Sequence, residues 1–322
     1  MRYLETGLWA DVRQLPAALQ DTVDAAHGVA EAAGVLRGAQ RIVATGNGAA
    51  YYVAHALWLA GLELGGPPLV ALPCGIVARE GFAWQPGDAV LAVSSSGEFR
   101  DVVEIAQRSG ARPCVAITAN ADSALAAASD AVVLQQVHSQ RAVTHTQALA
   151  GVYACGLAVM GGDLEGVVEA AAEAVTEAET WAASLSGLGS PPAAIAVGGG
   201  AAWAAALELA LMLKEISRIP AEGVETREGA TSAMFGLDRG HLMVSLDPDG
   251  DPLGDEAVRL CAAAGATTLR FPPAARADAR LAPITTLPAA AALAAELALA
   301  AGHDVDSPAW TDAYYETARS AT

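Results

Sequence analysis

The feature that most constrains the fold of this chain is a unit of strand, glycine turn and helix that occurs twice. Residues 41–64 begin with an apolar strand, turn at the segment 45–48 (TGNG) and continue as an apolar helix. Residues 193–218 follow the same order, with the turn at 198–200 (GGG). A strand that leads through glycine into a helix is a building block of parallel-sheet folds. The second half therefore looks like a diverged copy of the first.

Other apolar runs predict further strands, and these runs alternate with helical stretches. Strands are expected at 68–72, 88–93, 113–118, 131–134, 242–246 and 267–271. Helices are expected at 99–109 and 288–301. Aromatic residues make up only 5% of the chain, so small and branched side chains must fill the core. The predicted fold class is α/β, with parallel sheets covered by helices.

The length of 322 residues suits two domains of about 130 residues each. Apolar residues at helical spacing near the N-terminus predict a helical lead-in over residues 1–37. The Ser, Gly and Pro content of residues 181–192 indicates a connection between domains. We predict a first domain at 38–180, a second at 190–308 and a tail at 309–322.

The formal net charge of −18 argues against nucleic acid as a partner. A phosphate backbone is bound by clusters of basic residues, and Lys214 is the only lysine in the chain. A small anionic ligand is compatible with this charge, because backbone N–H groups and helix N-termini can hold a phosphate without lysine. We expect a small-molecule ligand.

Apolar stretches are broken about every ten residues by Gly, Pro, Asp or Arg, so we expect none to reach the roughly 20 residues that a membrane span requires. The N-terminus lacks the pattern of a secretory signal, which predicts a cytoplasmic protein. The four cysteines, Cys74, Cys114, Cys155 and Cys261, are widely spaced and lie mostly in apolar runs. That pattern indicates reduced core residues rather than a disulfide or metal site. We expect no metal and no cofactor.

Three serines and a glycine, Ser94 to Gly97, follow the strand predicted at 88–93 and precede a helix. We call this segment the serine loop. A helix N-terminus offers unpaired N–H groups and about half a positive charge, and hydroxyls donate further hydrogen bonds to phosphate oxygens. Ser94, Ser95 and Ser96 are therefore predicted phosphate ligands. Alternatively, a serine only caps the helix.

The serine loop resembles the Ser-x-Ser-Gly-Glu-Thr loop of sugar isomerase (SIS) domains. Residues 206–217 resemble the catalytic helix in the isomerase half of glucosamine-6-phosphate synthase. The resemblance extends over residues 40–308 and includes Asp304 to Pro308. It implies two tandem SIS domains, each a flavodoxin-like α/β/α sandwich with a parallel sheet. It also implies a homodimer that binds a phosphorylated ketose or amino sugar.

Two glutamates on the resembling helix, Glu208 and Glu215, are the predicted catalytic residues. In the family, the glutamate that matches Glu215 moves a proton between adjacent sugar carbons. Glu208 lies seven residues earlier, about two helical turns back on the same face. A positioned carboxylate can take a proton from one carbon and return it to the next, and burial raises its pKa. An ion pair or helix cap is the alternative role for Glu208.

The chain departs from synthase-like members at the residues that open the sugar ring. Thr231 stands where those members carry a histidine, and threonine cannot shuttle protons near neutral pH. The family's C-terminal lysine has no counterpart in residues 309–322. Met212 and Phe99 also replace a family lysine and the threonine of the serine loop. We expect no glutaminase domain, because the chain begins helically without an N-terminal cysteine.

Further residues are assigned to the ligand site by the resemblance. Asn47 and Gly48 belong to the family's glycine turn, and Thr231 occupies the histidine position. His145 lies in a segment that aligns with a substrate-lining turn, so it is a possible substitute for the missing histidine. A structural role at a helix start is the alternative. Glu228 could orient a sugar hydroxyl, with exposed loop charge as the alternative.

These observations lead to an enzyme hypothesis and two alternatives. The first is an aldose/ketose isomerase or a deaminase/deglycase that transfers protons at adjacent carbons of a phosphorylated sugar or amino sugar. The second is a non-catalytic phosphosugar binder or partner subunit that lacks the ring-opening residues. The third keeps the fold but takes a cyclitol or carbocyclic phosphate, which needs no ring opening.

Overall fold

The computed structural model describes residues 2–307 and 311–319, and the chain divides into two compact units. The first-sheet unit consists of Ala17–His138, Gln147–Glu165 and Trp310–Thr322. The second-sheet unit consists of Met1–Pro16, Ser139–Thr146 and Gly166–Ala309. The units therefore interleave along the chain, whereas each predicted domain is one continuous segment.

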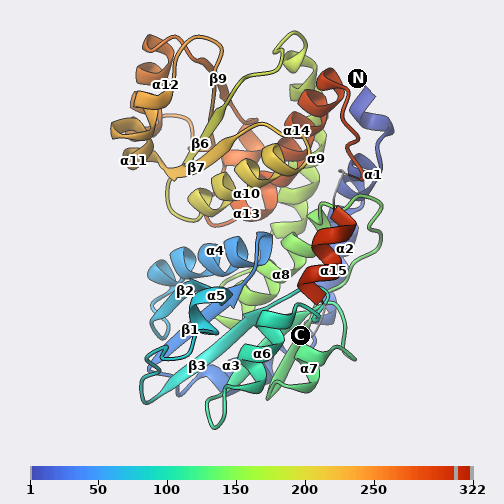
Figure 1. Ribbon diagram of the computed structural model, residues 1–322, viewed down its shortest axis with the longest axis vertical. Coiled ribbons are helices and arrows are strands. Elements are labelled where there is room, and N and C mark those ends of the chain that lie inside the picture. Colours follow the sequence, from blue (N-terminus) through green and yellow to red (C-terminus); the bar gives the residue numbers. More distant parts are fainter. Residues whose placement is uncertain (1, 308–310, 320–322) are drawn as a thin grey trace. The chain divides into compact units, whose positions relative to one another are not determined.

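A five-stranded parallel sheet in the order β2-β1-β3-β4-β5 forms the first-sheet unit, and Figure 1 labels its strands β1, β2 and β3. Its strands are β1 (Arg41–Gly46), β2 (Leu69–Pro73), β3 (Asp88–Val93), β4 (Cys114–Thr118) and β5 (Ala131–Leu134). Its helices are α2 (Leu15–Ala25), α3 (Val29–Leu36), α4 (Ala49–Leu64), α5 (Cys74–Val77), α6 (Arg100–Gln107), α7 (Ala124–Ala127), α8 (Thr146–Val159) and α15 (Thr311–Arg319). Every residue of β3 is buried, as expected for a central strand with helices on both faces.

A four-stranded parallel sheet in the order β7-β6-β8-β9 forms the second-sheet unit. Its strands are β6 (Ala194–Gly198), β7 (Ala221–Glu225), β8 (Leu242–Ser245) and β9 (Thr267–Arg270). Its helices are α1 (Gly7–Arg13), α9 (Val167–Ala182), α10 (Ala201–Glu215), α11 (Thr226–Thr231), α12 (Pro252–Ala263), α13 (Ala282–Thr285) and α14 (Leu287–Ala301). Short 3-10 turns lie at Arg2–Glu5, Ala183–Leu185, Ala233–Gly236 and Pro273–Arg276.

Each sheet buries one face under short helices of its own unit. In the first-sheet unit, a core cluster joins Val90 and Ala116 of the sheet to Ile105 of α6 and Leu125 of α7. In the second-sheet unit, the corresponding cluster joins the sheet to Ala230 of α11 and to α12. The helix α10 packs on β6 and β7. The α/β fold class predicted from the sequence is confirmed.

The two strand–turn–helix units share their backbone geometry as well as their order. Gly48 precedes α4 with φ 54° and ψ −128°, and Gly200 precedes α10 with φ 55° and ψ −137°. Side chains are excluded from this region of backbone space, so both turns require glycine. The order β2-β1-β3-β4 recurs as β7-β6-β8-β9. The internal repeat seen in the sequence is therefore a repeat of structure.

The structure corrects three expectations from the sequence. The strand β7 was not expected, because Ala221–Glu225 (AEGVE) carries two charged residues and lies at a sheet edge. The C-terminal tail contains a helix, Thr311–Arg319. The expectation that no apolar stretch is long enough to cross a membrane is also wrong.

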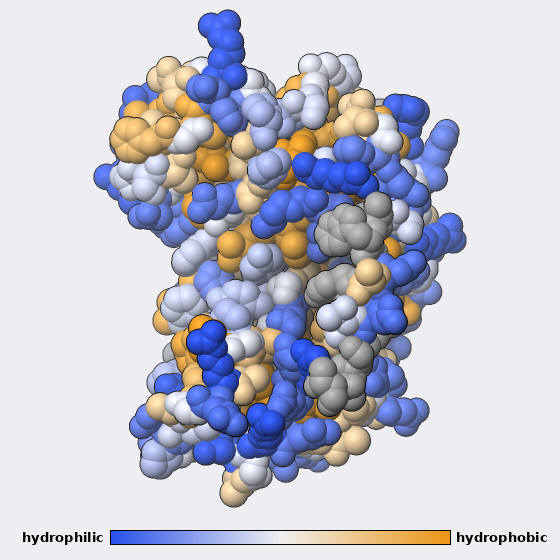
Figure 2. Space-filling model, in the orientation of Figure 1, coloured by the Kyte–Doolittle hydropathy of each residue, from blue (hydrophilic) through white to orange (hydrophobic). Residues whose placement is uncertain are grey.

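The segment that corrects this membrane expectation is Ala282–Ala301, whose 20 residues are long and apolar enough to span a bilayer. Its apolar window is 78% buried within the structure, as in the core helix of a soluble protein. Among the described residues, the large exposed apolar side chains are Leu62, Ile76, Phe235 and Leu253. The face drawn in Figure 2 mixes hydrophilic side chains with scattered apolar ones.

Candidate functional site

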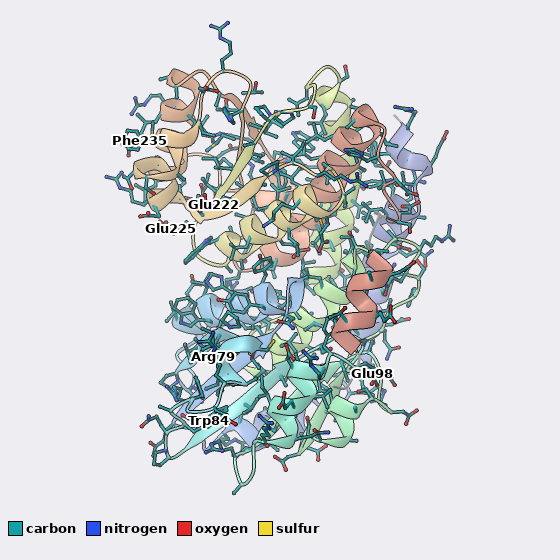
Figure 3. All side chains as sticks on the ribbon, viewed as in Figure 1. Arg79, Trp84, Glu98, Glu222, Glu225 and Phe235 are labelled. Carbon is teal, nitrogen blue, oxygen red and sulfur yellow. The ribbon has the colours of Figure 1, made fainter. Side chains whose placement is uncertain are left out.

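The serine loop leaves the carboxyl edge of the first sheet beside the glycine turn. The register pairs Thr45 of β1 with Ala92 of β3, so Asn47 and Ser94 follow their strands at the same edge. This is the edge at which open parallel sheets bind ligands. The exposed Glu98, labelled in Figure 3, follows the serine loop.

The serines do not cap the helix that follows them. The N-cap residue of α6 is Phe99, and no side chain makes a capping hydrogen bond there. Instead, the Ser94 hydroxyl oxygen accepts from the Gly97 N–H at 3.1 Å, and that of Ser96 accepts from the Glu98 N–H at 3.3 Å. Ser94 is buried, whereas Ser95 and Ser96 are partly exposed. The α6 N-terminus is therefore left without a side-chain cap.

The neighbouring strands hold Ser95 in place. Its carbonyl accepts from the Thr118 hydroxyl at 3.0 Å and from the Ala119 N–H at 2.9 Å. Its hydroxyl oxygen accepts from Nε2 of Gln135 at 3.1 Å. Gln135 is 2% exposed and directly follows β5. Sequence reasoning missed Gln135, and its only signal is a polar residue at the end of an apolar strand.

The glycine turn is held by a buried thiol. Cys74 begins α5, and its thiol donates a hydrogen bond to Oδ1 of Asn47 at 2.7 Å. Burial raises the pKa of Cys74 to about 11, so the thiol keeps its proton at neutral pH. The prediction that the cysteines are reduced and buried is confirmed for all four. The orienting role of Cys74 was not expected.

Glu208 and Glu215 lie on α10 of the second-sheet unit, a helix built mainly from alanine and leucine. Glu208 is 5% exposed, and its Oε2 has no hydrogen-bond partner within the described chain. Burial, with a smaller contribution from the charge of Glu215, raises the pKa of Glu208 to about 8. Burial raises the pKa of Glu215 to about 7, against the opposing charge of Lys214. Neither interpretation of Glu208 as an ion pair or as a cap matches these contacts.

The second glycine turn is closed by a carboxylate of the chain itself. Oδ1 of Asp247 accepts from the Gly199 N–H at 2.8 Å, and the Thr226 hydroxyl donates to the same carboxylate at 2.8 Å. Asp247 is 3% exposed. Desolvation raises its pKa, and these hydrogen bonds oppose the rise. The backbone of the turn at 198–200 therefore donates to a carboxyl group of the chain itself, which sequence reasoning missed.

Thr231 and Glu228 lie on the exposed side of the short helix α11. The Thr231 hydroxyl donates to the carbonyl of Arg227 at 2.9 Å, within its own helix. Oε1 of Glu228 accepts from the Ser232 hydroxyl at 2.7 Å. The N-cap of α11 is Glu225, labelled in Figure 3. Both predicted residues are thus engaged locally.

His145 belongs to the segment Ser139–Thr146, which is part of the second-sheet unit. Buried Asp11 of α1 anchors this segment by accepting from the Ser139 hydroxyl and from the Arg141 and Ala142 N–H groups, at 2.6–3.0 Å. Nε2 of His145 is hydrogen-bonded to the side-chain amide of Gln140. This contact is consistent with the structural alternative for His145.

The acidic stretch at 304–308 connects the two ends of the second-sheet unit through Asp306. The carboxylate of Asp306 accepts from the Gly7 and Leu8 N–H groups at 2.7 and 2.8 Å. Its carbonyl accepts from the Val143 N–H at 2.9 Å. Pro308 of this stretch lies outside the described residues.

The predicted site residues thus form two groups, one in each unit. Ser94, Ser95, Ser96, Asn47 and Gly48 come together at the edge of the first sheet. The remaining predicted residues, Glu208, Glu215, Glu228, Thr231 and His145, lie in the second-sheet unit.

The first-sheet unit also contains a cavity of about 190 Å³, which is separate from the predicted site. It is lined by residues 77–82, Trp84, Ile105 and Arg108, and none of the predicted site residues lines it. Within residues 2–307 and 311–319, no group of three His, Cys, Asp or Glu side chains could hold a metal ion.

Comparison with known proteins gives a domain match to part of the chain and several solved structures with a similar fold. The SIS domain matches residues 35–159, and no curated protein sequence matches the chain. The chain is similar to the C-terminal domain of glucosamine-fructose-6-phosphate aminotransferase from Francisella tularensis, with a TM-score of 0.78 and 17% identity, covering 93% of this chain and 98% of that one.

Two further solved structures are similar over most of their length. Glucosamine-6-phosphate deaminase from Thermotoga maritima gives a TM-score of 0.80 at 18% identity, covering 95% of this chain and 98% of that one. Tagatose-6-phosphate ketose/aldose isomerase from Escherichia coli gives 0.78 at 17%, covering 95% and 97%. At such identities the likeness concerns the fold, and it confirms the predicted architecture of two tandem SIS domains.

Proposed function

We propose that this chain, whose residues 35–159 match the SIS domain, is an enzyme acting on a phosphorylated sugar or amino sugar by proton transfer at adjacent carbons. The reaction would be an aldose/ketose isomerisation or a deamination. Glu215 is the proposed base, and Glu208 is its proposed proton-holding partner. The serine loop is the proposed phosphate anchor.

The observation that carries the proposal is the state of the two carboxyls on α10. A general base works best when its pKa lies near the operating pH, and burial raises the pKa of Glu215 to about 7. Glu208, with a pKa raised to about 8, holds its proton when Glu215 begins to lose one. Two neighbouring carboxyls with separated pKa values support an acid/base pair.

The serine loop supports the phosphate part of the proposal. The N-terminus of α6 carries no side-chain cap, and the N–H groups of Ser95 and Ser96 have no acceptor among the described residues. Unpaired N–H groups bind oxyanions readily, and the dipole of α6, which begins at Arg100, favours negative charge at its N-terminus. A phosphate at this edge would need no lysine.

Solvent-deuterium exchange into sugar phosphates tests the proposed chemistry. The protein is incubated in D₂O with aldose, ketose and amino-sugar 6-phosphates, and proton NMR follows loss of the signal at the carbon next to the carbonyl. We expect exchange with at least one of these sugars, and Glu215→Gln should slow it by about 10²-fold or more. Glu173→Gln on the exposed face of α9 is the matched control. Equal exchange by both variants would refute the role of Glu215.

One observation favours a second candidate, a phosphosugar binder without ring-opening chemistry. The Thr231 hydroxyl, at the position of the family's histidine, is bonded to its own helix. A binder would be stabilised by phosphorylated sugars yet would show no exchange in either linear or cyclic sugars. A carbocyclic phosphate that stabilises the protein as strongly as an open-chain one would favour the third hypothesis.

We also propose a cytoplasmic homodimer that binds neither nucleic acid nor membrane. The dimer is what the family resemblance implies, and the net charge of −18 opposes binding to a phosphate backbone. Light scattering after size-exclusion chromatography measures the mass directly. A mass equal to that of one chain, 32.5 kDa, would refute the dimer.

A further inference from the structure

The polar groups at the edge of the first sheet share one hydrogen-bonding pattern. The hydroxyl oxygens of Ser94, Ser95 and Ser96 each accept from an N–H group of the protein. Oδ1 of Asn47 accepts from the Cys74 thiol. In every case the acceptor atom is used inside the protein. None of the three hydroxyls donates to an acceptor in the described part of the chain.

This pattern determines which hydrogen-bonding role the edge can offer a ligand. A serine hydroxyl has one proton to donate, and an asparagine amide has two on its nitrogen. When a protein donor occupies the oxygen, that proton is directed away from the donor. The edge therefore presents protons at Ser95, Ser96 and Asn47, all of which are partly exposed. A ligand oxygen that only accepts hydrogen bonds matches such a surface.

Two buried residues impose this polarity. Gln135 reaches Ser95 from the end of β5, 40 positions away in the sequence, and it packs against Gly151 of α8 so closely that a Cβ there would lie 2.4 Å from its Oε1. Cys74 reaches Asn47 from the start of α5 and is fully buried. Neither side chain is placed to contact a ligand, because both lie beneath the groups that they orient.

We propose that Gln135 and Cys74 are positioning residues that turn Ser95 and Asn47 into hydrogen-bond donors, so that the edge takes a fully ionised oxyanion such as a phosphate monoester. This inference rests on the proposed phosphate site and adds its polarity and the two residues that set it. No charged side chain is required to hold the anion. Selection comes from donated hydrogen bonds alone.

The test is titration calorimetry of the full-length protein with inorganic phosphate at pH 8. Gln135→Met keeps the length and burial of the side chain but removes the donor, and we expect it to weaken phosphate binding about three- to tenfold. Gln135→Glu replaces the donor with an acceptor and adds negative charge, so it should bind weakest. Cys74→Ala should lose about fivefold, and Cys74→Ser, which keeps a donor, should recover most of that loss.

Cys114→Ala is the matched control, because Cys114 is an equally buried cysteine at the opposite end of β4. It should lower the melting temperature and leave phosphate affinity unchanged. If the unaltered protein binds no phosphate at millimolar concentration, the phosphate site and this inference both fail. If it binds phosphate but Gln135→Met and Cys74→Ala bind as tightly, or if Cys74→Ser gives no recovery, the phosphate site stands and the positioning roles are refuted.

Discussion

The charge of Glu215 raises the pKa of Glu208 from about two turns further along α10, so the two carboxyls do not ionise together. The larger cause is burial, since Glu208 lies in a helix whose buried face is otherwise apolar. Burying the Glu208 carboxyl costs free energy of folding, because its Oε2 has no hydrogen-bond partner among the described residues. Its retention in this position is what a functional role would explain.

Glu208→Gln should stabilise the protein in alkaline solution and leave it unchanged in acid. Because the folded-state pKa is raised from 4.5 to about 8, the folded state keeps a proton that the unfolded chain has lost, and stability falls as pH rises across that window. At high pH, the gain in free energy of unfolding for Glu208→Gln relative to the parent is limited to about 5 kcal/mol. Urea unfolding at pH 4.5, 7 and 9 measures it. If Glu208→Gln were less stable than the parent protein at pH 9, the raised pKa of Glu208 would be contradicted.

Lys214→Met should shift the ionisation of Glu215 to higher pH. Burial raises the pKa of Glu215 and the charge of Lys214 lowers it, so removing that charge should raise the pKa further. Because Lys214 is exposed, the upward shift should be about half a unit or less. Carbon-13 NMR of the labelled glutamate carboxyls gives the titration without any substrate. Lys214→Arg keeps the charge and should leave the midpoint in place.

Asp306→Ala should destabilise the second-sheet unit by about 2–4 kcal/mol. The change removes the side-chain acceptor of two N–H groups at the start of α1, which have no other acceptor among the described residues. Asp304→Ala is the control, because within the described part of the chain the exposed Asp304 accepts only from its own turn, and its loss should cost about 1 kcal/mol. Chemical unfolding of both variants checks the difference. Equal losses would mean that the link to α1 contributes little.

Two glycine-to-alanine changes in helices should have opposite signs. Gly34 of α3 has open space around its missing Cβ, so Gly34→Ala should stabilise by about 0.5–1 kcal/mol. A Cβ on Gly254 of α12 would lie 2.7 Å from Cβ of the buried Asp247. Gly254→Ala should therefore destabilise by displacing the carboxylate from Gly199. Melting temperatures of the two variants test both signs.

Local patterns in the sequence were enough to predict most strands, because β1, β3 and β4 are runs of apolar residues that end at glycine or polar residues. The strand β7 was not predicted, because this edge strand contains two glutamates and has no apolar pattern. The serine loop and Glu215 were recognisable from neighbouring residues. Gln135 was not, because its partner Ser95 is 40 positions away and nothing nearby in the sequence indicates the pairing.

The same limit applies to Asp247, which meets Gly199 from 48 positions away. Its sequence context, a short strand followed by a loop, is shared by many acidic residues. Gln135 and Asp247 contact their partners because the fold brings distant segments together, and sequence spacing does not indicate such contacts. They were therefore absent from the predicted site, whereas the groups that would touch a ligand were present in it.

The hydrogen bonds from Gly7 and Leu8 to Asp306 have a consequence for synthesis on the ribosome. Asp306, which accepts the hydrogen bond from the Gly7 N–H, is synthesised 299 residues after Gly7. The helix α1 must therefore wait, without this partner, until almost the whole chain has emerged, while most of the first-sheet unit is complete by Glu165. The order of emergence thus favours the first-sheet unit as the earlier folding intermediate, with the N-terminus docking last. A nascent chain stopped before Asp306 would expose α1 to proteases.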